Sequence, residues 1–82
     1  MSHYTQNNLT EMDVLMLFNL DTSQEGIKIH NTADPALISA ANRLYDAGFI
    51  TNVDGGYLTP LGREAADHTH SLFTMLNAHS KE

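Results

Sequence analysis

Two helix starts that carry the same signature constrain this chain most. Asp34-Pro35 and Thr59-Pro60 each place a side-chain acceptor before a proline, which is tolerated at the first helical position because its missing N–H would have no partner there. Gly48 ends the helix that Asp34 begins, since glycine adopts the left-handed conformation of a residue just past a helix end. The segment between Gly48 and Thr59 is therefore enclosed by two helices.

That enclosed segment has the composition of a β-hairpin. Residues 49–53 predict a strand, Asp54-Gly55-Gly56 supplies a turn that tolerates positive φ, and Tyr57-Leu58 predicts the returning strand. An isolated hairpin is marginal in water, so we expect it to pack on helices. Ile27 and Ile29 share one face of a short alternating segment that can add a third strand. The sequence leaves open whether 21–33 forms a helix, or a turn followed by this strand.

Three helices are predicted, at 10–20, 34–47 and 60–78. Thr10 caps the first, in which eight of the twelve residues from Leu9 to Leu20 are apolar. A helix this apolar is expected to be buried on all sides. On the last helix we expect a core-facing stripe that includes Leu72, with Arg63 and His70 facing away. The predicted core is Leu15, Phe18, Ile27, Ile29, Leu37, Leu44, Phe49, Ile50, Leu58, Leu61, Leu72 and Leu76.

These elements predict one α+β domain at 10–78, with three helices, a small antiparallel sheet, and flexible tails at 1–9 and 79–82. The chain has 82 residues, of which 41% are apolar, and no tryptophan. A domain this small buries only about 60% of its unfolded surface, so a monomer would be marginally stable.

Two segments resemble known families. A helix ending in LYDAGFI (44–50), a glycine turn and then YLTPLGRE (57–64) resemble the second half of winged-helix domains in bacterial regulators. This resemblance covers about residues 34–66 and implies a winged-helix-like fold in which the hairpin is the wing. Through the segment around DGGYLT and LGREAA (54–66), the chain is also similar to a family of small uncharacterised proteins of Gammaproteobacteria.

The resemblance implies DNA binding as an alternative function, in which helix 34–47 and the wing at 49–58 contact the duplex. Two features disfavour it: one helix fits where a helix-turn-helix has two, and the net charge is −6, with four Lys and Arg against ten Asp and Glu. The candidate DNA-contacting residues are Ser39, Asn42 and Arg43 for base edges, and Lys28 and Arg63 for phosphates.

Protein–protein contact is the favoured function. The apolar excess of the first helix would leave a contiguous exposed patch, and such patches usually mark interfaces. The last helix is longer than the hairpin needs, and the winged-helix resemblance implies dimerisation through a terminal helix. We therefore predict a small interaction or regulatory module that forms a homodimer through the first and last helices. The candidate interface residues are Leu9, Met12, Met16, Leu17, Phe73 and Leu76.

Other functions lack the residues they need. The chain has no cysteine, which excludes disulfides and thiolate ligands. His68 and His70 are two residues apart and diverge on a helix, and two ligands do not make a zinc site. No nucleophile–base pair or phosphate-binding loop is recognisable. We expect no enzyme activity, cofactor or metal, and the lack of a signal sequence or a long apolar run predicts a cytoplasmic protein.

Overall fold

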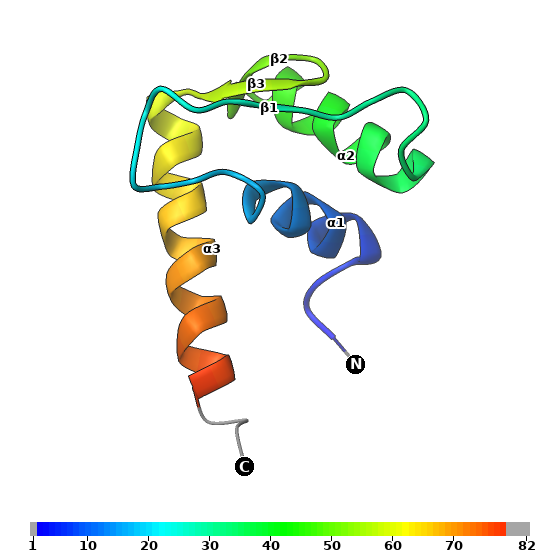
Figure 1. The fold of residues 1–82 in the computed structure, drawn as a ribbon. Coiled ribbons are helices and arrows are strands. Elements are labelled where there is room, and N and C mark those ends of the chain that lie inside the picture. Colours follow the sequence, from blue (N-terminus) through cyan, green and yellow to red (C-terminus); the bar gives the residue numbers. More distant parts are fainter. Residues whose placement is uncertain (1, 79–82) are drawn as a thin grey trace.

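The computed structural model describes residues 2–78 and has the predicted α+β architecture. The three strands form an antiparallel sheet in the order β1-β3-β2. Figure 1 shows α2 and α1 beneath this sheet, with α3 running down one side past both. The elements are α1 (Gln6–Leu15), β1 (Ile27–Lys28), α2 (Pro35–Asp46), β2 (Ile50–Asn52), β3 (Gly55–Leu58) and α3 (Pro60–Ala78). The predicted tail at 79–82 lies outside the described residues.

The bounds of α1 differ from the prediction at both ends. It begins four residues before its predicted start and ends five residues before its predicted end, so 6–9 are helical rather than part of a tail. Thr5 caps it through a capping box: the Thr5 hydroxyl accepts from the Asn8 amide at 3.0 Å, and the Asn8 side chain accepts from the Thr5 amide at 3.1 Å. Thr10, the predicted cap, instead donates its hydroxyl to the Asn7 carbonyl inside the helix.

The start and end of α2 are as predicted. The Asp34 side chain accepts from the Ala36 amide at 2.9 Å, and proline occupies the first turn. Gly48 has a φ of 87°, the left-handed conformation expected after a helix end. Local signals determine both ends, which explains why the sequence alone predicts this helix.

The hairpin is present, but its turn is displaced from the predicted position. Val53 and Asp54 form the turn, while Gly55 and Gly56 belong to β3 with φ of 127° and 72°. The pairing shifts register between Ile50 and Asn52, and the Tyr57 amide donates to the Thr51 hydroxyl at 2.9 Å across this bulge. The third strand is also confirmed, because β1 pairs with β3.

The junction between hairpin and α3 fixes the direction of the last helix. The Thr59 hydroxyl accepts from the Gly62 amide at 3.0 Å and donates to the Gly48 carbonyl at 2.6 Å, so one side chain joins the end of α2 to the start of α3. Gly62 lies against the Phe49 carbonyl so closely that a Cβ would overlap that oxygen. The helix therefore approaches β2 on its glycine face.

The core lies between the sheet, α1, α2 and the first turns of α3. Five predicted members are buried and four others are partly buried against them, but three were wrong: Leu61, Leu72 and Leu76 are 50%, 47% and 63% exposed. The buried residues of α3 are Gly62 and Ala66, because the glycine contact turns a different face inward. The buried core residues are Val14, Leu15, Phe18, Ile29, Ala40, Ala41, Leu44, Ile50 and Ala66.

Within residues 2–78, none of the helices has both the length and the apolar character that crossing a lipid bilayer requires.

Candidate functional site

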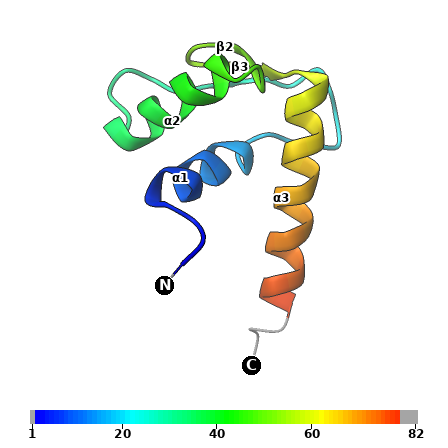
Figure 2. The ribbon, with the colours of Figure 1, turned by 180° about the vertical axis from the view of Figure 1, so that it is seen from behind.

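An apolar groove of about 210 Å³ lies between α1 and the C-terminal half of α3. Figures 1 and 2 show α3 continuing well past α1, so the two helices form the sides of an open angle. Thioether and isobutyl groups of α1 face an aromatic ring and leucines of α3 across it. The lining residues are Leu9, Met12, Asp13, Met16, Thr69, Leu72, Phe73 and Leu76.

Hydrogen bonds from α3 hold the C-terminal end of α1 against it. The Arg63 guanidinium donates to the carbonyls of Leu20 and Thr22, in the loop five and seven residues past the end of α1. About two turns further along, His70 Nε2 lies 3.1 Å from the Leu15 carbonyl oxygen and donates to it. His70 thus reaches a carbonyl of the last turn of α1, where intrahelical partners run out, and Arg63 holds the loop that follows the helix. The prediction that Arg63 and His70 face away was therefore wrong.

A charged pair holds α1 against α2 on its other side. Arg43 Nε donates to Glu11 Oε2 at 2.6 Å, with the two side chains 36% and 23% exposed. A charge-assisted bond of this length in a partly desolvated position is stronger than a typical surface pair. The α1 wall of the groove is thus braced from both neighbouring helices.

The groove face of α3 passes from buried to exposed along one continuous stripe. Gly62, Ala66, Thr69, Phe73 and Leu76 follow a spacing of four and three residues, which keeps them on one side of a helix. The first two are buried and Thr69 is half-buried, whereas Phe73 and Leu76 are 52% and 63% exposed. The stripe that packs on the core at one end is left open to solvent at the other.

The same part of α3 carries no formal charge. Residues 68–78 contain no Asp, Glu, Lys or Arg, although the whole chain has a net charge of −6. Asp13 is the acidic residue in the groove lining. An apolar and uncharged surface of this kind suits another uncharged surface better than it suits a polyanion or a strongly basic partner.

Five of the six predicted interface residues line this one groove. Leu17 does not: it follows α1 in a turn and is 54% exposed, which also shows that the expected burial of this segment on all sides was wrong. Sequence reasoning did not select Thr69 and Leu72 for the interface. Leu72 was assigned to the core, yet its position four residues before Leu76 is the signal that could have placed it here.

The candidate DNA-contacting residues are not gathered on one face. Lys28 and Asn42 line a shared recess beside the hairpin turn, and Ser39 is exposed on α2. Arg43, a predicted base-edge contact, is half-buried in its pair with Glu11. Together with Arg63, these residues include every Lys and Arg within 2–78, and each of the three cations is bonded to the protein itself.

Lys28 is bonded to the turn of the hairpin. Its Nζ lies 3.1 Å from Asp54 Oδ2, and both side chains are exposed. The hydrogen bond from the Lys28 ammonium, with a smaller contribution from its charge, holds the pKa of Asp54 below its ordinary value. The predicted phosphate contact is therefore partly neutralised by an acidic neighbour.

The histidines of the described segment do not assemble with acidic residues into a metal site. Among residues 2–78, no three His, Asp or Glu side chains lie close enough together to hold an ion. His68 is exposed on α3, while His70 is hydrogen-bonded to the end of α1, so the two side chains diverge as predicted.

Comparison with known proteins places the chain in a family. A family profile described as a family of unknown function, DUF5669, matches residues 2–77. The chain belongs to the DUF5669 family. Searches of curated proteins and of solved structures found no match. The match extends from α1 through α3, so the groove lies entirely within the DUF5669 segment of the chain.

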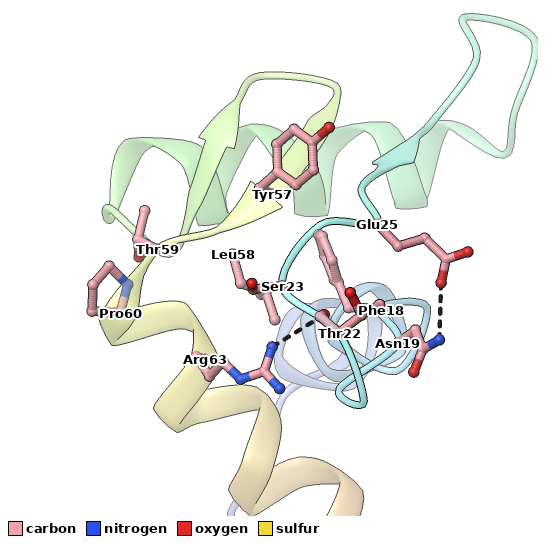
Figure 3. A pocket seen from close by; sticks show the side chains of 10 residues that line it. All are labelled: Phe18, Asn19, Thr22, Ser23, Glu25, Tyr57, Leu58, Thr59, Pro60 and Arg63. Carbon is pink, nitrogen blue, oxygen red and sulfur yellow. Dashed lines mark hydrogen bonds between the residues drawn. The ribbon is translucent and has the colours of Figure 1, made fainter.

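A second recess of this DUF5669 chain, of about 200 Å³, lies where the segment after α1 meets the start of α3. Figure 3 shows Arg63 directed at Thr22, and Asn19 bonded to Glu25 across one side of it. Its charged groups are thus bonded to neighbouring protein groups, as expected of a junction between elements. The groove between α1 and α3 is the stronger candidate site.

Proposed function

We propose that this DUF5669 protein is a small, non-catalytic interaction module of winged-helix type that acts through protein–protein contacts as a homodimer. Its dimer surface is the groove between α1 and α3. The observation that carries the proposal is the stripe on α3 that continues from the core into solvent, where its apolar side chains lie opposite those of α1.

The topology supports the winged-helix assignment. The sheet order β1-β3-β2 places the first strand beside the second strand of a hairpin, and this hairpin lies between α2 and α3. The resemblance of 44–50 and 57–64 to winged-helix domains predicts this arrangement. The connection from β1 to α2 is only six residues long, 29–34, and contains no helix. In this respect the protein departs from a helix-turn-helix.

The exposed apolar area supports a second copy as the partner. Half-exposed side chains of this size leave on the order of 100 Å² each in water. Four apolar groove residues of each copy are about half-exposed, and its two groove methionines are partly exposed, so two copies would bury roughly 1,000 Å², the lower bound for a specific interface. The absence of formal charge in 68–78 lets two chains of net charge −6 approach there without direct repulsion.

The DNA-binding alternative has less support. A specific binder that neutralises several phosphates needs free cations, with about six to ten phosphate contacts in well-studied cases. In the described part of this chain the cations Lys28, Arg43 and Arg63 each bond to a carboxylate or a carbonyl of the protein itself.

A charge placed in the groove tests the dimer. We expect Leu76→Glu to weaken self-association at least about 100-fold, because pairing would bury an uncompensated carboxylate. Leu76 is 63% exposed in a single copy, so the fold should tolerate the change. Sedimentation velocity across a concentration series measures the dissociation constant directly.

Ser71→Glu is the matched control. It adds the same charge to the same helix at an exposed position on the opposite face, and it should leave the dissociation constant nearly unchanged. A wild-type protein that sediments as a monomer at high micromolar concentration would overturn the proposal. Equal weakening of self-association by both variants would show that the dimer does not form through the groove.

A further inference from the structure

We infer that the two copies close as a two-fold four-helix arrangement, in which the C-terminal half of each α3 fills the groove of the other copy. This inference rests on the proposed function and specifies its geometry. It follows from three properties of α3. Its exposed residues line the groove and also project into solvent. Its first turns are covered by the rest of the protein, and its charged residues lie in its N-terminal half.

The exposed end of α3 is both one wall of the groove and its best occupant. Phe73 and Leu76 line the groove, yet they are also the side chains that project furthest into solvent from this stripe. Because the same side chains form both the wall of the groove and the part that can fill it, this surface is complementary to an identical copy of itself. Such a contact is isologous, so it closes at two copies and does not propagate into a filament.

The covered end of α3 determines the direction in which the helices run. Its first turns are enclosed by the body, where Gly62 lies against the Phe49 carbonyl and Arg63 against the segment after α1. The exposed part around Phe73 begins about 16 Å further along the helix axis. The α3 helix of a second copy can reach this exposed part only if the rest of that copy lies beyond the C-terminal end of the first α3. The two α3 helices therefore run antiparallel.

The charge distribution leads to the same direction. Glu64 and Asp67 lie in the first half of α3, and residues 68–78 have no formal charge. A parallel pair would bring each carboxylate next to its own copy, which is unfavourable. An antiparallel pair centred near Phe73 keeps the acidic turns of the two helices apart and also opposes their dipoles favourably.

The side-chain spacing fits helix-to-helix packing. Thr69, Phe73 and Leu76 repeat at four and three residues, the spacing with which side chains of one helix enter the holes of another. Met12 of α1 and Met16, the residue that caps its C-terminus, supply the flexible side chains that adapt to an inserted helix. With α1 and α3 contributed by each copy, four helices meet at the contact, and each α1 crosses the antiparallel α3 pair at the open angle seen in Figures 1 and 2.

Cysteine cross-linking tests this geometry, and the chain contains no cysteine that would interfere. Thr69→Cys, Leu72→Cys and Leu76→Cys each place one thiol on the groove face, and Ser71→Cys places one on the opposite face. Disulfides require Cα atoms within about 7 Å, so under mild oxidation one groove-face variant should give a covalent dimer at least ~10-fold faster than Ser71→Cys.

The outcomes separate the geometry from the dimer itself. A dimer by sedimentation in which no groove-face thiol outpaces Ser71→Cys would overturn the antiparallel contact and leave the homodimer intact. Cross-linking of Thr69→Cys and Leu76→Cys as fast as that of Leu72→Cys, the variant nearest the centre of the contact, would indicate parallel helices and also overturn it. Assemblies that grow beyond two copies with concentration would contradict isologous closure, and a strictly monomeric protein would contradict the proposed function as well.

Discussion

Gly62 and Gly48 are both required by the fold, but for different physical reasons. A Cβ on Gly62 would overlap the Phe49 carbonyl oxygen, which belongs to a backbone that cannot move without displacing β2. A Cβ on Gly48 would meet no atom within 4 Å, and only the φ of 87° favours glycine there. Close approach is therefore the constraint at the start of α3, and backbone conformation is the constraint at the end of α2.

Substitutions at these two glycines should differ in how far they lower the free energy of unfolding and in whether asparagine is better tolerated than alanine. We expect Gly62→Ala to lower the free energy of unfolding by about 2–3 kcal/mol, because α3 must shift off the sheet. Gly48→Ala should cost about 1 kcal/mol, and Gly48→Asn less, since asparagine tolerates the left-handed region. Urea denaturation of the three variants measures these values. Equal losses for both alanine variants would contradict the close contact.

The Lys28–Asp54 pair predicts a weak dependence of stability on acid pH. The pKa of Asp54 is lowered in the folded state, mainly by the hydrogen bond from Lys28, so ionised Asp54 favours folding. This contribution is present above the ordinary aspartate pKa of about 4 and is lost as the pH falls through the folded-state value. An NMR titration should show the Asp54 pKa rising toward its ordinary value in Lys28→Gln; an unchanged value would contradict the bond.

At the scale of elements, α2 and the hairpin could be predicted because each end has its own local signal. Asp34, Gly48 and Thr59 fix their positions through neighbours only a few residues away. The start of α1 was missed because both Thr5 and Thr10 can cap a helix. The choice between them depends on Asn8, which completes a capping box only with Thr5.

The candidate site could be predicted in part. Apolar excess in residues 9–20 identified Leu9, Met12 and Met16, whereas the length of the last helix and the winged-helix resemblance identified Phe73 and Leu76. Periodicity could not show that Leu72 and Leu76 lie beyond the core, because that depends on where the facing helix ends. The inward direction of Arg43 and His70 depends on acceptors more than thirty residues away, Glu11 and Leu15.

The Arg43–Glu11 bond should be measurable as a coupling between α1 and α2. We expect Arg43→Met to lower the free energy of unfolding by about 1–2 kcal/mol, because Glu11 is left half-buried without its donor. In a double-mutant cycle with Glu11→Gln, the second change should cost much less in the Arg43→Met background. Strictly additive losses would show that the pair does not brace the groove.

At the scale of the whole molecule, the charge predicts weak affinity for nucleic acids. With a net charge of −6 and its described cations bonded internally, the protein should give no shift of a random DNA duplex in low-salt gels at micromolar concentration. Tight binding that weakens steeply with added salt would contradict this expectation and favour the DNA-binding alternative.

The brevity of the outer strands has a consequence for how this molecule can associate. The strands at the two margins of the sheet are only two and three residues long, β1 and β2. Unpaired backbone at a sheet margin invites strand addition from other chains, and margins this short offer little template for it. Amyloid-like stacking and recruitment of extended peptides are thereby discouraged, so the contact that we propose between two copies has to be made by helices.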